Sequence, residues 1–318
     1  MKTIGVVGLG DMGGGVATTL LKKGYRVMGY DISLQRQEQY SAIGIITADS
    51  KALGKACEAV LLFLPMAPFD PTLEDFLLRK ERLLEYMQPG SILIECGNTS
   101  PTLERILAEQ ALSRGVGFID APASGGPQGA INGTLSVMAG GGEEDFQKAH
   151  PLLKDISAEV NYFGPVGSGQ TAKLINNMIV NGELALLSEV MVFAKKNGLE
   201  VDKLLNTLGK GAASSWVLST YGNGIYERPD RTYQTPGGGF EGKKQGGRDK
   251  QLAWAIELGE ELEVPLPMTT TAYQMFMMAR GMGKGGLFEP IVAMLEDMTH
   301  VDVSQSSDEK KLFPISVK

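Results

Sequence analysis

Short apolar segments alternate with helical patterns through the first half of the chain. Residues 17–24, 73–87 and 101–115 show helical spacing of apolar positions between these segments. The strand-like runs are residues 4–7, 27–31, 59–65, 91–96, 115–122 and 134–140. Alternation of this kind predicts βαβ units and a mainly parallel sheet.

The strand signal stops after residue 164, and helical spacing takes over. Apolar residues recur every three or four positions over residues 170–197, and Gly198 is a suitable helix stop, so one long helix is expected there. Residues 201–208, 250–259 and 269–281 also read as helices. By contrast, residues 234–247 contain too many glycines for a helix interior and are predicted to form a loop. The polar tail from residue 304 is expected to be frayed or docked on a neighbour.

A glycine motif joins the first predicted strand to the first predicted helix. Gly8 permits a tight turn, Gly10 allows the backbone to approach a pyrophosphate, and Gly13 allows close packing of helix on strand. Asp31 ends the second strand, where a carboxylate can accept hydrogen bonds from ribose hydroxyls and would repel a 2′-phosphate. The combination predicts a dinucleotide site that prefers NAD, with NADP less favoured. A glycine-rich turn without a ligand is the alternative.

The predicted architecture is therefore α/β, with two domains joined by a helix. We expect an N-terminal Rossmann domain with a doubly wound sheet over residues 1–164, a long interdomain helix over residues 165–198, and an all-helical C-terminal domain over residues 199–318. A chain of 318 residues is long for a single core, which agrees with this division.

Composition narrows the possible partners and compartments. A net charge of −7 argues against a nucleic-acid partner. We find no apolar run of about 18 residues in the sequence, so a membrane-spanning segment is not expected. The chain begins directly with a strand, without the pattern of an export signal, so a cytoplasmic location is expected. Two cysteines and two histidines are too few for a disulfide framework or a histidine-rich metal site, and no metal is expected.

Two segments offer residues for chemistry. Ser124, Gly125 and Gly126 follow a predicted strand and combine a hydroxyl with closely spaced amides, which suits a carboxylate. A tight connection between strands explains the same residues equally well. Lys173 and Asn177 stand four residues apart near the start of the long helix, so they share one face.

Lys173 is the candidate proton carrier. Its helix neighbours are apolar, and burial would shift a lysine toward the range in which it exchanges protons near neutrality. The alternative is a surface lysine with a snorkelling stem. No tyrosine is followed four residues later by lysine, so a catalytic tyrosine–lysine dyad is disfavoured. His150 and His300 look like a surface residue and a tail residue, so a catalytic histidine is disfavoured as well.

The motifs GLGDMG, DAPASGGPQGA, GSGQTAKLINN and RDKQLAWA, in this order, resemble those of the β-hydroxyacid dehydrogenase family. This family is typified by 3-hydroxyisobutyrate dehydrogenase and tartronate semialdehyde reductase, with 6-phosphogluconate dehydrogenase as a more distant relative. The resemblance implies interconversion of a small 3-hydroxy acid with its semialdehyde or keto acid, in a homodimer or homotetramer. It also implies that Lys173 is the general acid/base, that Asn177 places the substrate, and that the Ser124 segment binds its carboxylate.

Further residues are expected at the substrate and cofactor sites. Trp216 is a candidate for the wall of the substrate pocket, although we expect it mainly to pack in the core. The expected cofactor contacts are Gly8, Gly10, Asp11, Met12, Gly13, Asp31, Leu64, Pro65, Asn98 and Arg248.

Two segments depart from the family pattern. Gly97, Asn98 and Thr99 replace the usual serine-threonine pair, and Arg248 precedes Asp249 where the family has lysine. Lys243, Lys244 and Arg248 could meet a second anionic group of the substrate, but a solvated, charged loop is the preferred interpretation.

Three alternative functions remain open at this point. One is a semialdehyde or glyoxylate reductase that works with NADH or NADPH. A second is a non-catalytic, dinucleotide-binding interaction module, and a third is an imine reductase. Retention of Lys173 disfavours the last two.

Overall fold

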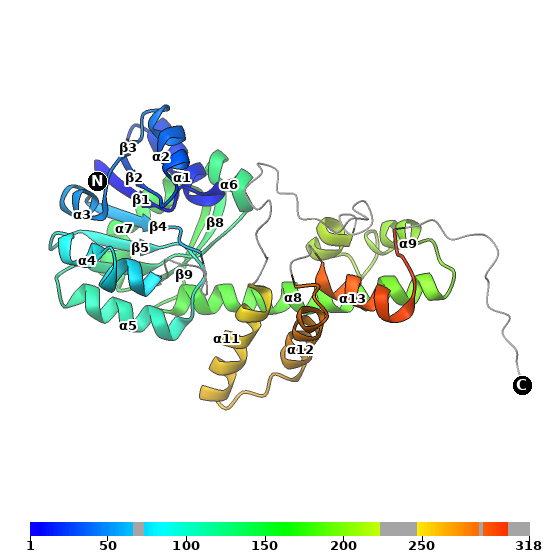
Figure 1. Cartoon of the computed structure of the whole chain (residues 1–318). Coiled ribbons are helices and arrows are strands. Elements are labelled where there is room, and N and C mark those ends of the chain that lie inside the picture. Colours follow the sequence, from blue (N-terminus) through cyan, green and yellow to red (C-terminus); the bar gives the residue numbers. More distant parts are fainter. Residues whose placement is uncertain (66–72, 223–246, 286–288, 305–318) are drawn as a thin grey trace, which may run out of the picture. The chain divides into compact units, whose positions relative to one another are not determined.

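The computed structural model describes residues 1–65, 73–222, 247–285 and 289–304 (Figure 1). The chain divides into two compact units, residues 1–173 and 174–318. The first unit contains the sheet and the second is helical, as the sequence pattern predicts. Helix α8 (Ser168–Lys196) begins in the first unit and continues into the second. The predicted loop over residues 234–247, apart from Gly247, and the tail beyond Ser304 lie outside the described residues.

The sheet of the first unit is mainly parallel. Its order is β3-β2-β1-β4-β5-β6-β8-β7, with β9 paired to β8. Strands β1 to β6 pair in parallel, whereas β8 runs antiparallel to β6 and β7. The strands are β1 (Thr3–Val7), β2 (Arg26–Tyr30), β3 (Ile46–Thr47), β4 (Ala59–Leu62), β5 (Ile92–Glu95), β6 (Gly117–Asp120), β7 (Ala123–Ser124), β8 (Leu135–Gly141) and β9 (Ser157–Tyr162).

Two hydrophobic cores lie on the two faces of this sheet. Successive strand residues point to opposite faces, so Val6 joins one core and Val7 the other. Helices α1 (Asp11–Lys22), α6 (Gly126–Asn132) and α7 (Glu143–Asp155) contribute side chains to the first core. Helices α3 (Ser50–Ala56), α4 (Leu83–Tyr86) and α5 (Pro101–Leu112) contribute to the second. Strands buried on both faces explain the continuous apolar runs in the sequence. Helix α2 (Leu34–Ser41) has no buried residue.

The segment expected as one helix over residues 73–87 is interrupted. A short π-helix, η1 (Asp75–Arg79), is followed by the single turn of α4. Arg82 between them adopts a left-handed conformation with φ of 52°, which a continuous helix cannot contain.

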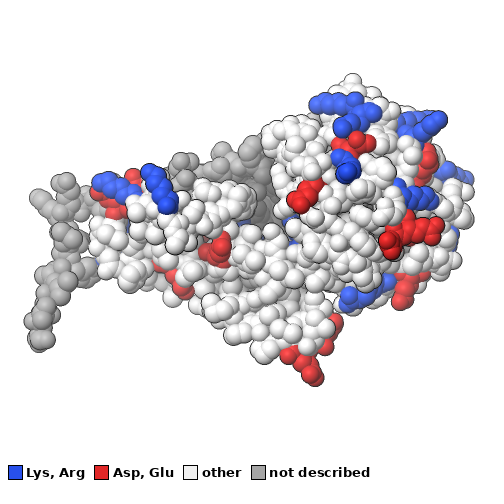
Figure 2. Space-filling view, turned by 180° about the vertical axis from the view of Figure 1, so that it is seen from behind, with Lys and Arg blue, Asp and Glu red and all other residues white. Residues whose placement is uncertain are grey.

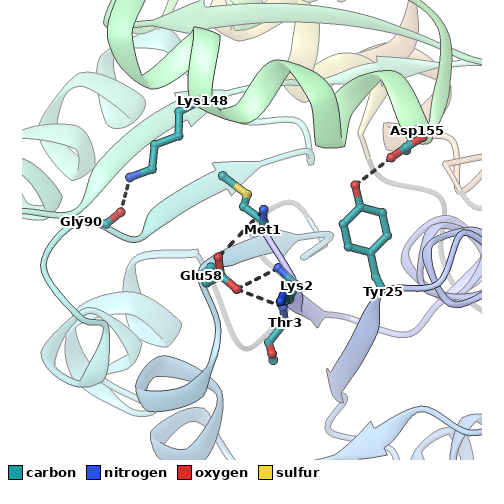
Figure 3. Close-up of polar contacts among 8 residues, drawn as sticks. All are labelled: Met1, Lys2, Thr3, Tyr25, Glu58, Gly90, Lys148 and Asp155. Carbon is teal, nitrogen blue, oxygen red and sulfur yellow. Dashed lines mark hydrogen bonds and ion pairs between the residues drawn. The ribbon is translucent and has the colours of Figure 1, made fainter.

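Polar contacts fix the start of the chain and the end of α7 (Figure 3). The Glu58 carboxylate accepts hydrogen bonds from the backbone N–H groups of Lys2 at 2.8 Å and Thr3 at 3.3 Å. The Tyr25 hydroxyl donates to the Asp155 carboxylate at 2.7 Å. These bonds hold β1 and the residue preceding β2 at the end of the sheet away from the glycine turn.

The described part of the second unit is built from helices. Beside α8 these are α9 (Val201–Leu208), the π-helix η2 (Leu218–Gly222), α11 (Arg248–Glu261), α12 (Pro267–Gly281) and α13 (Pro290–Thr299). Leu184 and Met191 of α8 pack with α9 and α13, whereas Ala185 packs with α11 and α12. Helix α8 is long and apolar enough to span a membrane by length and composition alone, but half of its most apolar window is buried, as expected for a core helix.

Charge is distributed unevenly over the face shown in Figure 2. Positive and negative side chains are interspersed over the first unit, and large areas of the second unit carry neither. On this face, therefore, no area of one charge sign extends over the first unit.

Candidate active site

The glycine turn after β1 forms a cradle that only glycine can form. Gly8 has φ of +84°, and a Cβ atom there would collide with the carbonyl oxygen of Phe63. A Cβ atom on Gly13 would collide with the carbonyl oxygen of Gly8. No side chain caps the first turn of α1 at Gly10, so its N–H groups remain available to an anion. This arrangement fits the pyrophosphate of a dinucleotide.

Asp31 is placed beside this turn at the end of β2. The carboxylate is buried, and it accepts hydrogen bonds from the N–H of Leu9 and the N–H of Ser33, each at 2.8 Å. The guanidinium of Arg36 lies 3.8 Å away. The carboxylate therefore lies where the ribose of a bound dinucleotide is expected.

The other residues predicted to contact the cofactor in the first unit follow the carboxyl ends of neighbouring strands. Leu64 and Pro65 come after β4, and Asn98 comes after β5. The Oδ1 atom of Asn98 is buried and has no hydrogen-bond partner among the described residues. An orphaned acceptor at this edge fits a ligand that donates a hydrogen bond, such as the hydroxyls or the carboxamide of a nicotinamide nucleotide.

The Ser124 segment has an unusual backbone. Ala123 and Ser124 form β7, and Gly125 and Gly126 adopt φ of 124° and 62°, conformations that favour glycine. The segment is both a tight connection next to β8 and a group of small residues with a hydroxyl.

Lys173 reaches this segment from the first turns of α8. Its ammonium donates hydrogen bonds to the carbonyl oxygen of Ala123 at 2.9 Å and to the Ser124 Oγ at 3.3 Å. Burial lowers the pKa of Lys173 to about 8. The structure thus brings together the two segments that the sequence separates by 49 residues.

Asn177 stands one helical turn beyond Lys173, where its Oδ1 accepts a hydrogen bond from Asn176 at 3.1 Å. Arg248, at the start of α11, pairs with the buried Glu289 at 3.3 Å, and the neighbouring Asp249 pairs with Arg280.

The expectation that Trp216 packs in the core is wrong, because its side chain is 62% exposed. Val217 and Leu218, the next two residues, are buried in its place. Lys243 and Lys244 lie outside the described residues.

Sequence reasoning missed a group of buried carboxyls beside α8. Asp120, at the end of β6, accepts hydrogen bonds from the N–H groups of Gly167 at 2.8 Å and Gln170 at 2.9 Å. Burial raises the pKa of Asp120 to about 6. Glu95 and Glu104 are also buried. A charged residue at the end of the apolar strand Ile92–Glu95 was the signal that could have revealed them.

Two family models cover most of the chain. The NAD binding domain of 6-phosphogluconate dehydrogenase matches residues 3–164, and the NAD-binding domain of NADP-dependent 3-hydroxyisobutyrate dehydrogenase matches residues 167–295. Relatives with established names extend over nearly the full chain. The chain is 31% identical to 2-(hydroxymethyl)glutarate dehydrogenase of Eubacterium barkeri, over 95% of this chain and 97% of that protein.

A second relative and a solved structure agree with these matches. NAD-dependent L-serine dehydrogenase of Pseudomonas aeruginosa is also 31% identical, over 94% of this chain and 99% of its own. The crystal structure of 3-hydroxyisobutyrate dehydrogenase from Salmonella typhimurium has the same fold, with a TM-score of 0.80 at 24% identity, over 92% of this chain and 100% of that one. The chain belongs to the β-hydroxyacid dehydrogenase family and is an oxidoreductase that uses a nicotinamide dinucleotide.

Proposed function

We propose that this enzyme interconverts a small 3-hydroxy acid and its semialdehyde or keto acid, with Lys173 as the general acid/base. The observation that carries this proposal is the position of the Lys173 amine, half-buried and 3.3 Å from the Ser124 hydroxyl. Its pKa of about 8 allows it to give and take a proton near neutral pH.

The Ser124 segment binds the substrate carboxylate in this proposal. The Ser124 hydroxyl and the amides of Gly125 and Gly126 are the donors, and in the reductive direction the Lys173 ammonium adds a positive charge beside them. The substrate hydroxyl then lies within reach of the Lys173 amine.

The protein contributes proton transfer and orientation to the reaction. Neutral Lys173 accepts the proton of the substrate hydroxyl during oxidation, and in the reverse direction its ammonium donates that proton to the carbonyl oxygen. Asn177 orients the substrate oxygen from the next turn of α8. Bound NAD supplies the hydride acceptor.

The cofactor in this proposal is NAD rather than NADP. A buried carboxylate at Asp31 favours ribose hydroxyls and disfavours a 2′-phosphate. The proposed cofactor contacts are Gly8, Gly10, Asp11, Met12, Gly13, Asp31, Leu64, Pro65, Asn98 and Arg248. Trp216 is a proposed residue of the substrate pocket wall.

The names of the relatives support a small hydroxy acid as the substrate class. They include a 2-(hydroxymethyl)glutarate dehydrogenase, an L-serine dehydrogenase and an L-threonate dehydrogenase.

The pKa of Lys173 favours a second candidate, reduction of a semialdehyde or of glyoxylate. With a pKa of about 8, the amine is mainly protonated at pH 7. An ammonium is the form that donates a proton to a carbonyl oxygen. Carbonyl reduction is therefore the direction that this group supports best at neutral pH.

We also propose a homodimer or homotetramer in the cytoplasm. Ile175, Ile179, Leu186 and Phe193 of α8 are between 54% and 72% exposed. They recur at helical spacing, so they form an apolar stripe of the kind that subunit contacts cover.

A substrate panel tests this proposal. Purified enzyme is assayed with small 2- and 3-hydroxy acids in the presence of NAD or NADP, and with semialdehydes and glyoxylate in the presence of NADH or NADPH. Turnover of at least one 3-hydroxy acid or its carbonyl product, with higher kcat/KM for NAD(H), is expected. Activity confined to 2-hydroxy acids would contradict the proposal.

A further inference from the structure

Three carboxyl groups are buried together near the start of α8, and the proposed proton transfer does not use them. Glu95 of β5, Glu104 of α5 and Asp120 of β6 are 2%, 0% and 0% exposed. None of the ion pairs formed by the described residues includes any of them. Buried carboxyls without a cation are costly unless some are neutral, so this group needs an explanation.

The side chain of Gln170 joins two of these carboxyls to the backbone. Its Nε2 lies 2.8 Å from Glu95 Oε2, 3.2 Å from Glu104 Oε1 and 3.0 Å from the carbonyl oxygen of Gly97. An amide nitrogen carries only two hydrogens, so these three acceptors share them. The other oxygen of Glu95 accepts a hydrogen bond from the N–H of Gly97 at 2.7 Å.

One oxygen of Glu104 indicates that this carboxyl is neutral. Its Oε2 atom is buried and receives no hydrogen bond from any described residue. The Glu104 and Glu95 side chains lie within hydrogen-bonding reach of each other. A neutral Glu104 resolves both observations, because its O–H donates to the Glu95 carboxylate and Oε2 no longer needs a donor. Burial, and next the neighbouring Glu95 charge, raise the pKa of Glu104 well above its ordinary value.

This network holds two segments of the proposed site. The Oε1 of Gln170 accepts a hydrogen bond from the N–H of Thr99 at 3.4 Å, so Gln170 contacts both ends of the loop that carries Asn98. Gln170 also stands one turn before Lys173 on α8, and Asp120 holds the first residues of the same helix. Loop and helix are therefore fixed to each other through Glu95, Glu104 and Gln170.

We propose that Glu104 is a positioning residue for the reaction: as a neutral acid it binds the Glu95 carboxylate and, with Gln170, keeps Asn98 and Lys173 in place. This inference rests on the proposed role of Lys173. The groups that face Glu104 are Glu95 and Cys96 from β5, Asp120 from β6 and the uncharged Gln170 from α8. All the titratable groups among them are acids, so loss of the Glu104 proton leaves adjacent negative charges without a counter-ion. The network then loosens.

Matched substitutions test the proposal. Glu104→Gln keeps a neutral donor of similar shape, Glu104→Leu removes the donor, and Glu109→Gln changes an exposed acid on the same helix. We expect kcat to stay within about threefold for Glu104→Gln and Glu109→Gln, and to fall at least tenfold for Glu104→Leu, with a rise in KM for NAD because Asn98 loses its support. Equal loss of kcat in Glu104→Gln and Glu104→Leu would overturn the proposal.

Infrared spectroscopy of the cofactor-free enzyme in D2O tests the proton itself. The carbonyl stretch of a neutral carboxylic acid should be present at pH 7 in wild type and Glu109→Gln, and its Glu104 component should be missing in Glu104→Gln. In oxidation assays, wild-type kcat should decline at alkaline pH, and this decline should disappear in Glu104→Gln. A purely packing role for Glu104 would leave the alkaline limb unchanged, and that result would overturn the proposal.

These readouts separate the inference from the function on which it rests. Absence of the neutral-acid band, together with an inactive Lys173→Ala enzyme, would overturn the role of Glu104 alone. Full activity of the Lys173→Ala enzyme would contradict both the positioning role of Glu104 and the proposed role of Lys173. If Glu104→Leu does not fold, two measurements still test the role of Glu104. They are the neutral-acid infrared band of the wild-type enzyme and the kcat of Glu104→Gln at alkaline pH.

Discussion

The Lys173 amine lies 3.3 Å from the Ser124 hydroxyl, although one residue opens a long helix and the other ends a two-residue strand. The carbonyl oxygen of Ala123 holds the same amine at 2.9 Å. This arrangement places a proton carrier directly beside the group proposed to bind the substrate carboxylate.

Ser124→Ala should weaken substrate binding more than it slows turnover. The variant loses one hydroxyl donor to the charged carboxylate, worth about 1.5–3 kcal/mol, or roughly tenfold to 150-fold in KM. Steady-state kinetics with the best substrate of the panel measure this, and Ser113→Ala on the surface at the end of α5 is the control. An unchanged KM would remove Ser124 from the binding site.

The pH dependence of kcat should have opposite signs in the two directions. Burial lowers the pKa of Lys173 to about 8, and oxidation needs the neutral amine. Oxidation should therefore rise with pH through about 8, before the alkaline decline assigned to Glu104 sets in, and carbonyl reduction should fall over the same rising range. Initial rates from pH 6 to 10 in both directions check this. Parallel profiles in the two directions would show that another group limits the rate.

Asp31→Asn should relax the choice of cofactor. The amide keeps the size of the side chain but removes the negative charge that repels a 2′-phosphate, while Arg36 stays 3.8 Å away. We expect kcat/KM to fall about tenfold for NAD and to rise for NADP. If the ratio of the two values does not change, Asp31 does not determine cofactor preference.

Gly13→Ala should impair both folding stability and NAD binding. The new methyl group would collide with the carbonyl oxygen of Gly8, so α1 must move away from β1. Gly182→Ala on α8 is the matched control, because nothing lies within 4 Å of its Cβ position and alanine is the better helix former. Thermal melts and NAD titration should show a loss for Gly13→Ala only. Comparable melts for both variants would contradict the close packing described here.

The sequence predicted best those strands whose pattern is set by burial alone. Strands β1, β4, β5 and β6 are buried on both faces, so their apolar runs could be recognised directly. Strands β3 and β7 have only two residues each and carry too little pattern to be predicted. The left-handed Arg82 that interrupts residues 73–87 has no sequence signal, because arginine rarely adopts this conformation.

The sequence predicted those parts of the site that lie within a short local motif. The glycines and Lys173 stand in local motifs, whereas Glu95, Glu104 and Gln170 are far apart in the chain and meet only in the folded sheet. Trp216 was placed in the core by its hydrophobicity, but hydrophobicity does not determine which surface position an aromatic residue occupies.

Replacement of one amine tests the central claim most directly. Lys173→Ala, compared with Lys196→Ala at the exposed end of the same helix, should lower kcat by roughly 10²- to 10⁴-fold and leave the Kd for NAD nearly unchanged. A Lys173→Ala enzyme that binds NAD normally and turns over at the wild-type rate would contradict the account.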